Sequence, residues 1–221
     1  MSVSIKLSAL TLAMGIAFSG SAFAASDVWD TPNPWGTSTL SEFAAWNVFG
    51  GTTDNSPEVA GSGTGSVKEN TGQAFLTGGG NIYSFSAATN FTATLAGSTS
   101  GLFDVYLRIG TLGTAPVPTA LLNGVSATKT SVVVATLGGF GGSEIETFWK
   151  WSNVTGSSLY TFRFGSLESS MSLDQLALAT VAIPTIPTGP VAAVPEPETY
   201  AMMLSGLGLM GFVARRRSKK S

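Results

Sequence analysis

The chain has 221 residues, a formal net charge of −2, and neither cysteine nor histidine. The lack of cysteine excludes disulfides and thiol nucleophiles, and the lack of histidine excludes a Ser–His triad and imidazole metal ligands. Most basic residues lie near the two ends of the chain, so the body between them is acidic. An acidic body argues against nucleic-acid binding, because phosphate neutralisation needs clustered lysine and arginine.

The first 24 residues have the three parts of a Sec-type signal peptide. Lys6 supplies a positive charge, residues 7–18 form an apolar core, and Ala22-Phe23-Ala24 provides small residues for cleavage. The apolar core is shorter than the roughly 20 residues of a membrane span, although a retained anchor is the alternative. We expect signal peptidase to recognise Ala22 and Ala24 and to cleave after Ala24.

Residues 25–72 are predicted to form an extended lead-in, one short helix and a Gly/Ser-rich loop. Pro32 and Pro34 exclude a regular helix at the start. Thr39 and Glu42 have capping-box spacing, and apolar residues follow at three-residue steps, which predicts a helix over residues 39–46. The remainder of this segment is rich in glycine, serine, threonine and asparagine, which is typical of a loop.

A two-residue period begins after Gln73 and predicts strands with one buried and one solvated face. Turn residues, and no helical segment, separate these strands. We therefore expect a mainly β fold, an antiparallel β-sandwich of the jelly-roll type, over residues 73–182. About eight strands are predicted, at residues 73–77, 81–86, 90–97, 102–110, 131–139, 144–151, 159–165 and 170–183.

The alternation also assigns side chains to faces. Asp104 and Arg108 fall on the solvated face of their strand, opposite a row of apolar residues. Glu144 and Glu146 likewise share a polar face and are predicted to be a solvated surface pair. The opposite face of that strand carries residues expected in the core, which are Ile145, Trp149 and Trp151.

Three residues are candidates for contact with a sugar. Trp29 and Trp35 lie in the proline-containing lead-in, where they either contact a ligand or cap the open edge of the sandwich. The segment YTFRFGSLESSMSLDQLAL resembles the final strands of carbohydrate-binding jelly rolls, where an aspartate often lies in the last strand. That resemblance implies that Asp174 is the corresponding aspartate and would contact the sugar. Its alternation with Leu176 and Leu178 favours a partly buried aspartate bonded to backbone instead.

The end of the chain has three parts after a proline-rich spacer at residues 183–193. They are Val194-Pro195-Glu196-Pro197, an apolar stretch at residues 199–214 and a basic tail at residues 215–220. The stretch would be roughly 24 Å long as a helix. The arginines Arg215, Arg216 and Arg217 could extend it to the membrane surface and keep the C-terminus in the cytoplasm. We predict a transmembrane helix here, and an ordinary stop-transfer anchor is the simpler interpretation.

These three parts, in this order, closely resemble the PEP-CTERM sorting signal of Gram-negative bacteria. The resemblance implies recognition by an exosortase, a membrane-embedded cysteine protease, and processing near Pro195, Glu196 and Pro197. The protein would pass through an inner-membrane intermediate and then reach the cell surface or the extracellular matrix. The body resembles ectodomains that accompany this tail and have no assigned activity.

We therefore expect an exported, non-catalytic surface or biofilm-matrix protein that associates with exopolysaccharide. Its processing partners would be signal peptidase and exosortase, and we expect no cofactor, no metal and no nucleic acid. A carbohydrate-binding module is the first alternative. A glycoside hydrolase that uses a carboxylate pair is the second.

Overall fold

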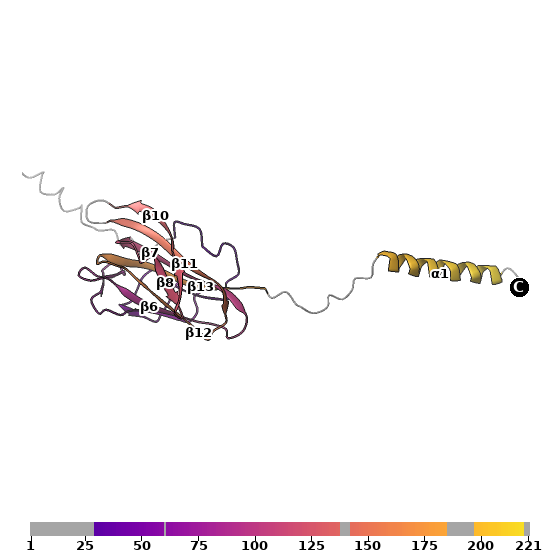
Figure 1. Ribbon diagram of the computed structural model, residues 1–221, viewed down its shortest axis with the longest axis horizontal. Coiled ribbons are helices and arrows are strands. Elements are labelled where there is room, and N and C mark those ends of the chain that lie inside the picture. The colour runs from indigo at the N-terminus through magenta and orange to yellow at the C-terminus, as the bar shows by residue number, and fades with distance from the viewer. Residues whose placement is uncertain (1–28, 60, 138–141, 185–196, 219–221) are drawn as a thin grey trace, which may run out of the picture. The chain divides into compact units, whose positions relative to one another are not determined.

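Two antiparallel β-sheets pack against each other in the computed structural model, which describes residues 29–59, 61–137, 142–184 and 197–218 (Figure 1). The seven-stranded sheet contains β1 (Glu42–Trp46), β4 (Phe75–Leu76), β5 (Ile82–Tyr83), β7 (Leu102–Gly113), β10 (Thr130–Thr136), β11 (Ser143–Thr155) and β13 (Met171–Ala182). The six-stranded sheet contains β2 (Thr53–Asp54), β3 (Gly65–Glu69), β6 (Asn90–Ala96), β8 (Thr119–Leu122), β9 (Val125–Thr128) and β12 (Leu159–Gly165).

The strand orders are β10-β11-β7-β13-β5-β4, with β1 also paired to β13, and β2-β3-β6-β12-β8-β9. These two antiparallel sheets confirm the predicted sandwich, whereas the finer prediction of a jelly roll is not confirmed. The inner faces of both sheets form one apolar core. Trp151 of β11 reaches across to Phe162 of β12, with ring centroids 5.9 Å apart, and so joins the two layers.

The helix predicted over residues 39–46 is wrong, because Glu42–Trp46 forms strand β1. This strand pairs with β13 from Glu42 opposite Thr180 to Trp46 opposite Leu176. Trp46 is fully buried in the core. Pairing along the side of β13 that β7 leaves open, together with burial of a large aromatic side chain, outweighs a local spacing that also suits a helix.

Four further strands lie where none was predicted. The Gly/Ser-rich loop contains β2 and β3, and β3 buries Val67 in the core while it pairs with β6. Strands β8 and β9 form a hairpin over residues 119–128, where no strand was predicted either. Asn123 and Gly124 connect its strands with φ values of 47° and 89°, the type I′ geometry that an Asn-Gly pair favours.

Helix α1 (Pro197–Ser218) follows the sandwich in the sequence and confirms that a helix includes residues 199–214. The finer prediction that this helix spans a membrane is not confirmed. The chain divides into two compact units, Met1–Pro184 and Thr185–Ser221, so the sandwich and the helix belong to different units. The predicted signal helix at residues 1–24 lies outside the described residues.

Substitution of Gly65 in β3 tests whether β3 packs closely against β1. A Cβ atom at this position would lie 2.7 Å from the Ala44 Cβ and 3.0 Å from the Trp46 ring. Because the sheets approach too closely here for a methyl group, Gly65→Ala should destabilise the fold by about 1–3 kcal/mol, measured by chemical denaturation. Gly78→Ala is the matched control, since its Cβ would meet nothing within 4 Å. Equal denaturation midpoints for the two variants would contradict the close approach of β1 and β3.

Candidate functional site

The C-terminal unit carries the residues predicted for sorting. Pro197 begins helix α1, a position that suits proline because its missing N–H would have no helical partner there. Glu198 lies in the first turn, where a negative charge is favourable. Pro195 and Glu196 lie outside the described residues. The predicted processing sequence therefore ends where the helix starts.

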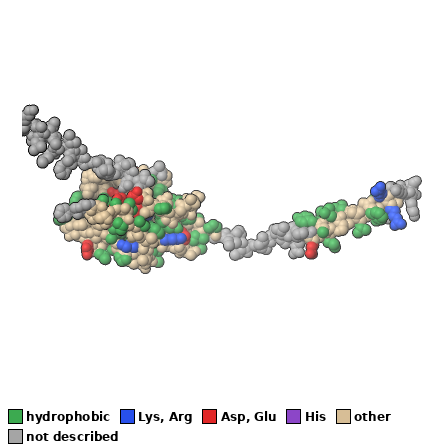
Figure 2. All heavy atoms as spheres, turned by 90° about the horizontal axis from the view of Figure 1, so that it is seen from above, with side chains coloured by type: hydrophobic (Ala, Val, Ile, Leu, Met, Phe, Trp, Pro, Cys, Tyr) green, Lys and Arg blue, Asp and Glu red, His purple; other side chains and the backbone are tan. Residues whose placement is uncertain are grey.

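Apolar side chains cover α1 along its length, and basic side chains gather at its C-terminal end (Figure 2). Leu204, Leu209 and Phe212 are among the exposed apolar residues. Arg215 and Arg216 are exposed, and Arg217 belongs to the last turn. Among the described residues, no helix has both the length and the mean hydropathy needed to cross a membrane.

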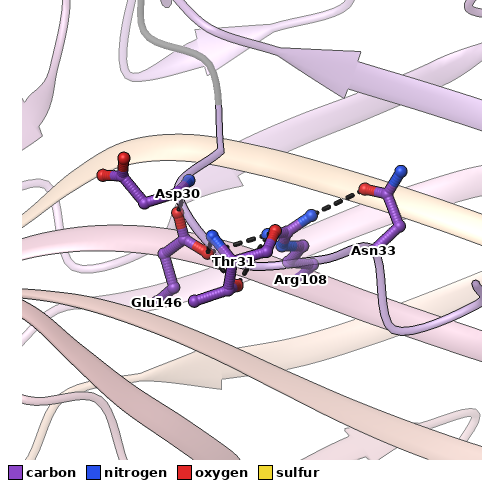
Figure 3. Close-up of polar contacts among 5 residues, drawn as sticks. All are labelled: Asp30, Thr31, Asn33, Arg108 and Glu146. Carbon is purple, nitrogen blue, oxygen red and sulfur yellow. Dashed lines mark hydrogen bonds and ion pairs between the residues drawn. The ribbon is translucent and has the colours of Figure 1, made fainter.

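The described part of the lead-in lies over the outer face of the seven-stranded sheet, the face that points away from the six-stranded sheet. Its contacts centre on Arg108 of β7 and Glu146 of β11, which form an ion pair 2.7 Å long (Figure 3). These side chains are 1% and 6% exposed. The prediction that Arg108 and Glu146 face solvent is therefore wrong, because a segment outside the sheet covers them.

All the lead-in groups that form hydrogen bonds with this ion pair belong to the short segment of residues 30–33. The Glu146 carboxylate accepts hydrogen bonds from the backbone N–H groups of Asp30 (2.6 Å) and Thr31 (3.1 Å) and from the Thr31 hydroxyl. The Arg108 guanidinium donates to the Thr31 carbonyl (2.6 Å) and to the Asn33 side-chain oxygen (2.7 Å). We call Asp30, Thr31, Asn33, Arg108 and Glu146 the Arg108–Glu146 cluster (Figure 3).

The surroundings of Glu146 determine its protonation. Burial alone raises the pKa of this carboxyl group, but hydrogen bonds from Thr31, Arg108 and the Asp30 N–H, with the charge of Arg108, outweigh burial and hold the pKa below its usual value. Burial lowers the pKa of Arg108 and Glu146 opposes that shift, so the guanidinium stays protonated. Glu146 is consequently ionised at neutral pH and cannot act as a general acid.

Trp29 and Trp35, the predicted ligand contacts, are both half-buried on this outer face. The Arg108 guanidinium carbon lies 4.0 Å from the centroid of the Trp29 ring, a cation–π contact. Trp35 meets Phe43 and Tyr106 edge to face, at centroid distances of 6.1 and 6.0 Å. The two tryptophans share no partner among the described ring contacts. Their role as ligand contacts stays a prediction.

Asp174 is the extra residue of a β-bulge in β13. In the pairing with β7, Leu173 lies opposite Thr111, whereas Gln175 lies opposite Gly110. The bulge interrupts the side-chain alternation, so the regular period used to group Asp174 with later core residues does not apply. The aspartate is half-buried. Its contact with a sugar also stays a prediction.

An open groove of about 560 Å³ lies between the β8–β9 hairpin and the C-terminal half of β11. Trp151 lines its base, is 5% exposed and donates its indole N–H to the Val125 carbonyl (2.9 Å). Asn123 and Asn153, which both line the groove, have positive φ values of 47° and 57°. Most of the other polar lining residues carry hydroxyl groups, namely Ser126, Thr128, Ser152 and Thr155. Lys150 also lines the groove, with its charge paired to Asp104. Such a surface suits a polar ligand without a net charge.

Several other carboxylates hold loops in place. Asp54 accepts hydrogen bonds from the N–H groups of Gly50 (2.6 Å) and Ser56 (2.8 Å). Glu69 accepts from the N–H groups of Gly72 (3.0 Å) and Asn90 (3.1 Å). Within the part of the chain that the structure describes, no group of three or more Asp, Glu, His or Cys residues could hold a metal ion.

Comparison with known proteins gives a match for the tail of the chain. The family model of the PEP-CTERM protein-sorting motif matches residues 193–217. No curated protein and no solved structure matches the chain significantly. The tail is thus a PEP-CTERM sorting motif, the kind of motif that exosortases process.

Glu146→Gln should destabilise the sandwich strongly. Removal of one partner from a buried ion pair leaves the other charge uncompensated, which costs about 3–5 kcal/mol and is measurable by chemical denaturation at neutral pH. The dependence on pH has a definite sign. The folded pKa of Glu146 is below the unfolded value of about 4.3, so its stabilisation is present above that pH and is lost as the pH falls through the folded pKa.

Asp104→Asn is the matched control for Glu146→Gln. Asp104 pairs with Lys150 at 2.6 Å, but the Lys150 side chain is 41% exposed, so the loss should stay below about 1 kcal/mol. The Glu146→Gln protein should also lack the acid-sensitive component of stability that Glu146 gives to the unmodified chain. Similar losses for both variants at neutral pH would contradict the structural importance of the Arg108–Glu146 cluster.

Proposed function

We propose that this chain, which ends in a PEP-CTERM sorting motif, is an exported, non-catalytic β-sandwich protein of the cell surface or extracellular matrix. The match of the sorting motif to residues 193–217 carries the proposal. The separation of the chain into a sandwich unit and a tail unit supports it, because a sorting tail must be removable without loss of the body.

Each of the three parts of the tail has its own role in the proposed sorting. The exosortase recognises Pro195, Glu196 and Pro197 and processes the chain near them. Before that, α1 holds the exported intermediate at the inner membrane through its apolar side chains, and Arg215 and its basic neighbours keep the C-terminus in the cytoplasm. The order of processing sequence, apolar helix and basic end supports this division of roles.

The state of Glu146 supports a non-catalytic body. A carboxylate-pair glycosidase needs one protonated carboxyl group and a second carboxylate across the substrate. Glu144 and Glu146 are neighbouring acidic residues on one strand face, but the Arg108–Glu146 cluster keeps Glu146 ionised and covers it with the lead-in. The pair is therefore a poor candidate for hydrolysis, and we place hydrolase activity last among the alternatives.

Carbohydrate binding is the second candidate function. The groove beside the β8–β9 hairpin offers hydroxyl and amide groups to a neutral polar ligand. The half-buried rings of Trp29 and Trp35 offer apolar contact area on the outer face. The resemblance of the last strands to those of carbohydrate-binding jelly rolls also supports carbohydrate binding. Exopolysaccharide is the ligand that an exported matrix protein would meet.

Intact-mass analysis tests the sorting proposal. In a host with a working exosortase, the exported protein should lack residues 1–24 and all residues after the processing site near Pro195, Glu196 and Pro197, including residues 215–221. Glu196→Ala should leave the tail attached and the protein in the membrane fraction, because it removes the charge of the recognition sequence. Glu198→Ala, which changes the same residue type two positions later in the first turn of α1, should be processed normally. Retention of residues 215–221 on the unmodified exported protein would overturn the proposal and favour a permanent anchor.

Binding of the exported protein to exopolysaccharide isolated from the host separates the two candidate functions. A carbohydrate-binding module should bind it, and Trp35→Ala should weaken binding by about tenfold, or about 1.4 kcal/mol. Phe85→Ala is the control, since Phe85 is 74% exposed and lies outside the lead-in. Circular dichroism checks that each variant is folded. Absence of binding by the unmodified protein would favour a matrix role without sugar recognition.

A further inference from the structure

Strand β10 lies at the edge of the seven-stranded sheet (Figure 1). One side of β10 pairs with β11. On its other side, β10 has no partner among the strands that the structure describes. An edge strand presents a row of backbone N–H and C=O groups that can pair with another strand.

The usual protections of an edge strand are weak in β10. Its sequence, TSVVVAT, has no charge, no proline and no glycine. Val132 is 47% exposed and Val133 is 59% exposed, and adjacent residues of a strand point to opposite faces. The nearest charge in sequence, Lys129, turns back and donates a hydrogen bond to the Pro116 carbonyl (2.7 Å). Among the residues that the structure describes, apolar surface is therefore exposed on both faces of this edge.

The regular part of the edge is short and well defined. Residues 130–133 of β10 pair in unbroken register with residues 145–148 of β11. A bulge then shifts the register between Val133 and Ala135. Because a bulge twists an edge away from further pairing, any added strand is limited mainly to the part before it.

We propose that β10 pairs with β10 of a second copy of this chain, antiparallel and around a two-fold axis, so that two seven-stranded sheets become one. Short uncharged segments rich in β-branched residues are the type that pairs with an identical segment. Two uncharged strands also meet without the repulsion of like charges. A two-fold contact of this kind is closed, so it gives a dimer and not a fibre. The proposal rests on the fold and is independent of sugar binding.

Cysteine cross-linking tests this pairing in the full chain. The natural sequence has no cysteine, so one introduced residue reports on one contact. Around a two-fold axis, one residue of β10 lies opposite its own copy, and its sequence neighbours lie opposite different residues. One of Val132→Cys and Val133→Cys should therefore give a disulfide-linked dimer when the protein is exported to an oxidising compartment, because facing residues of antiparallel strands have Cβ atoms about 4.5–5.5 Å apart. Leu167→Cys is the control, since Leu167 is 75% exposed but lies outside the strands, and it should stay monomeric.

Charge complementation provides a second measurement. Val133→Lys and Val133→Glu should each abolish the dimer in analytical ultracentrifugation of the exported protein, whereas their equal mixture should restore a heterodimer. Leu167→Lys should leave the dimer of the unmodified protein intact. Circular dichroism confirms that the variants remain folded.

Three results would overturn the proposal. They are failure of both Val132→Cys and Val133→Cys to cross-link more strongly than Leu167→Cys, a dimer that survives Val133→Lys, and capture of a different protein at β10 in place of a second copy. None of these results changes the mass of the processed chain or its binding to polysaccharide. Failure of the pairing and failure of the proposed function are therefore distinguishable.

Discussion

The buried ion pair between Arg108 and Glu146 makes the N-terminal lead-in part of the fold. The inner face of the seven-stranded sheet is covered by the second sheet, but its outer face carries a guanidinium and a carboxylate that are almost fully removed from water. Such charges are tolerated only when their hydrogen-bonding capacity is used. Thr31 and its neighbours supply those bonds, so the lead-in must lie on the sheet for the pair to be stable.

The sandwich and the tail carry different kinds of information. The tail is identified by three sequence features in order, and the family model that matches it covers residues 193–217 and no part of the sandwich. The body depends on packing between distant segments, such as Trp151 with Phe162 and Trp35 with Tyr106. A known sorting motif therefore gives the route of the protein and leaves the chemistry of its delivered domain to be determined from its own surface.

Local alternation predicted the long strands well, because β6, β7, β11 and β12 each have one apolar face that faces the core. It failed at β1, where the spacing of apolar residues also suits a helix. This segment is a strand because it pairs with the side of β13 that β7 leaves free. Glu146 was assigned to solvent because a strand pattern contains no sign that a separate segment covers its polar face. For Asp174, the bulge shifted the register by one residue, and the sequence gives no marker of that shift.

The strand that leads to the tail lies inside the sheet. β13 is hydrogen-bonded to β7 on one side and to β1 and β5 on the other, and the chain leaves the sandwich shortly after Ala182. A pull on the C-terminal end of this strand acts along its axis, so the hydrogen bonds on both sides bear the load together in shear. An edge strand would instead peel away one bond after another. The sandwich should therefore resist unfolding under mechanical tension at its C-terminal end better than it would if β13 were an edge strand.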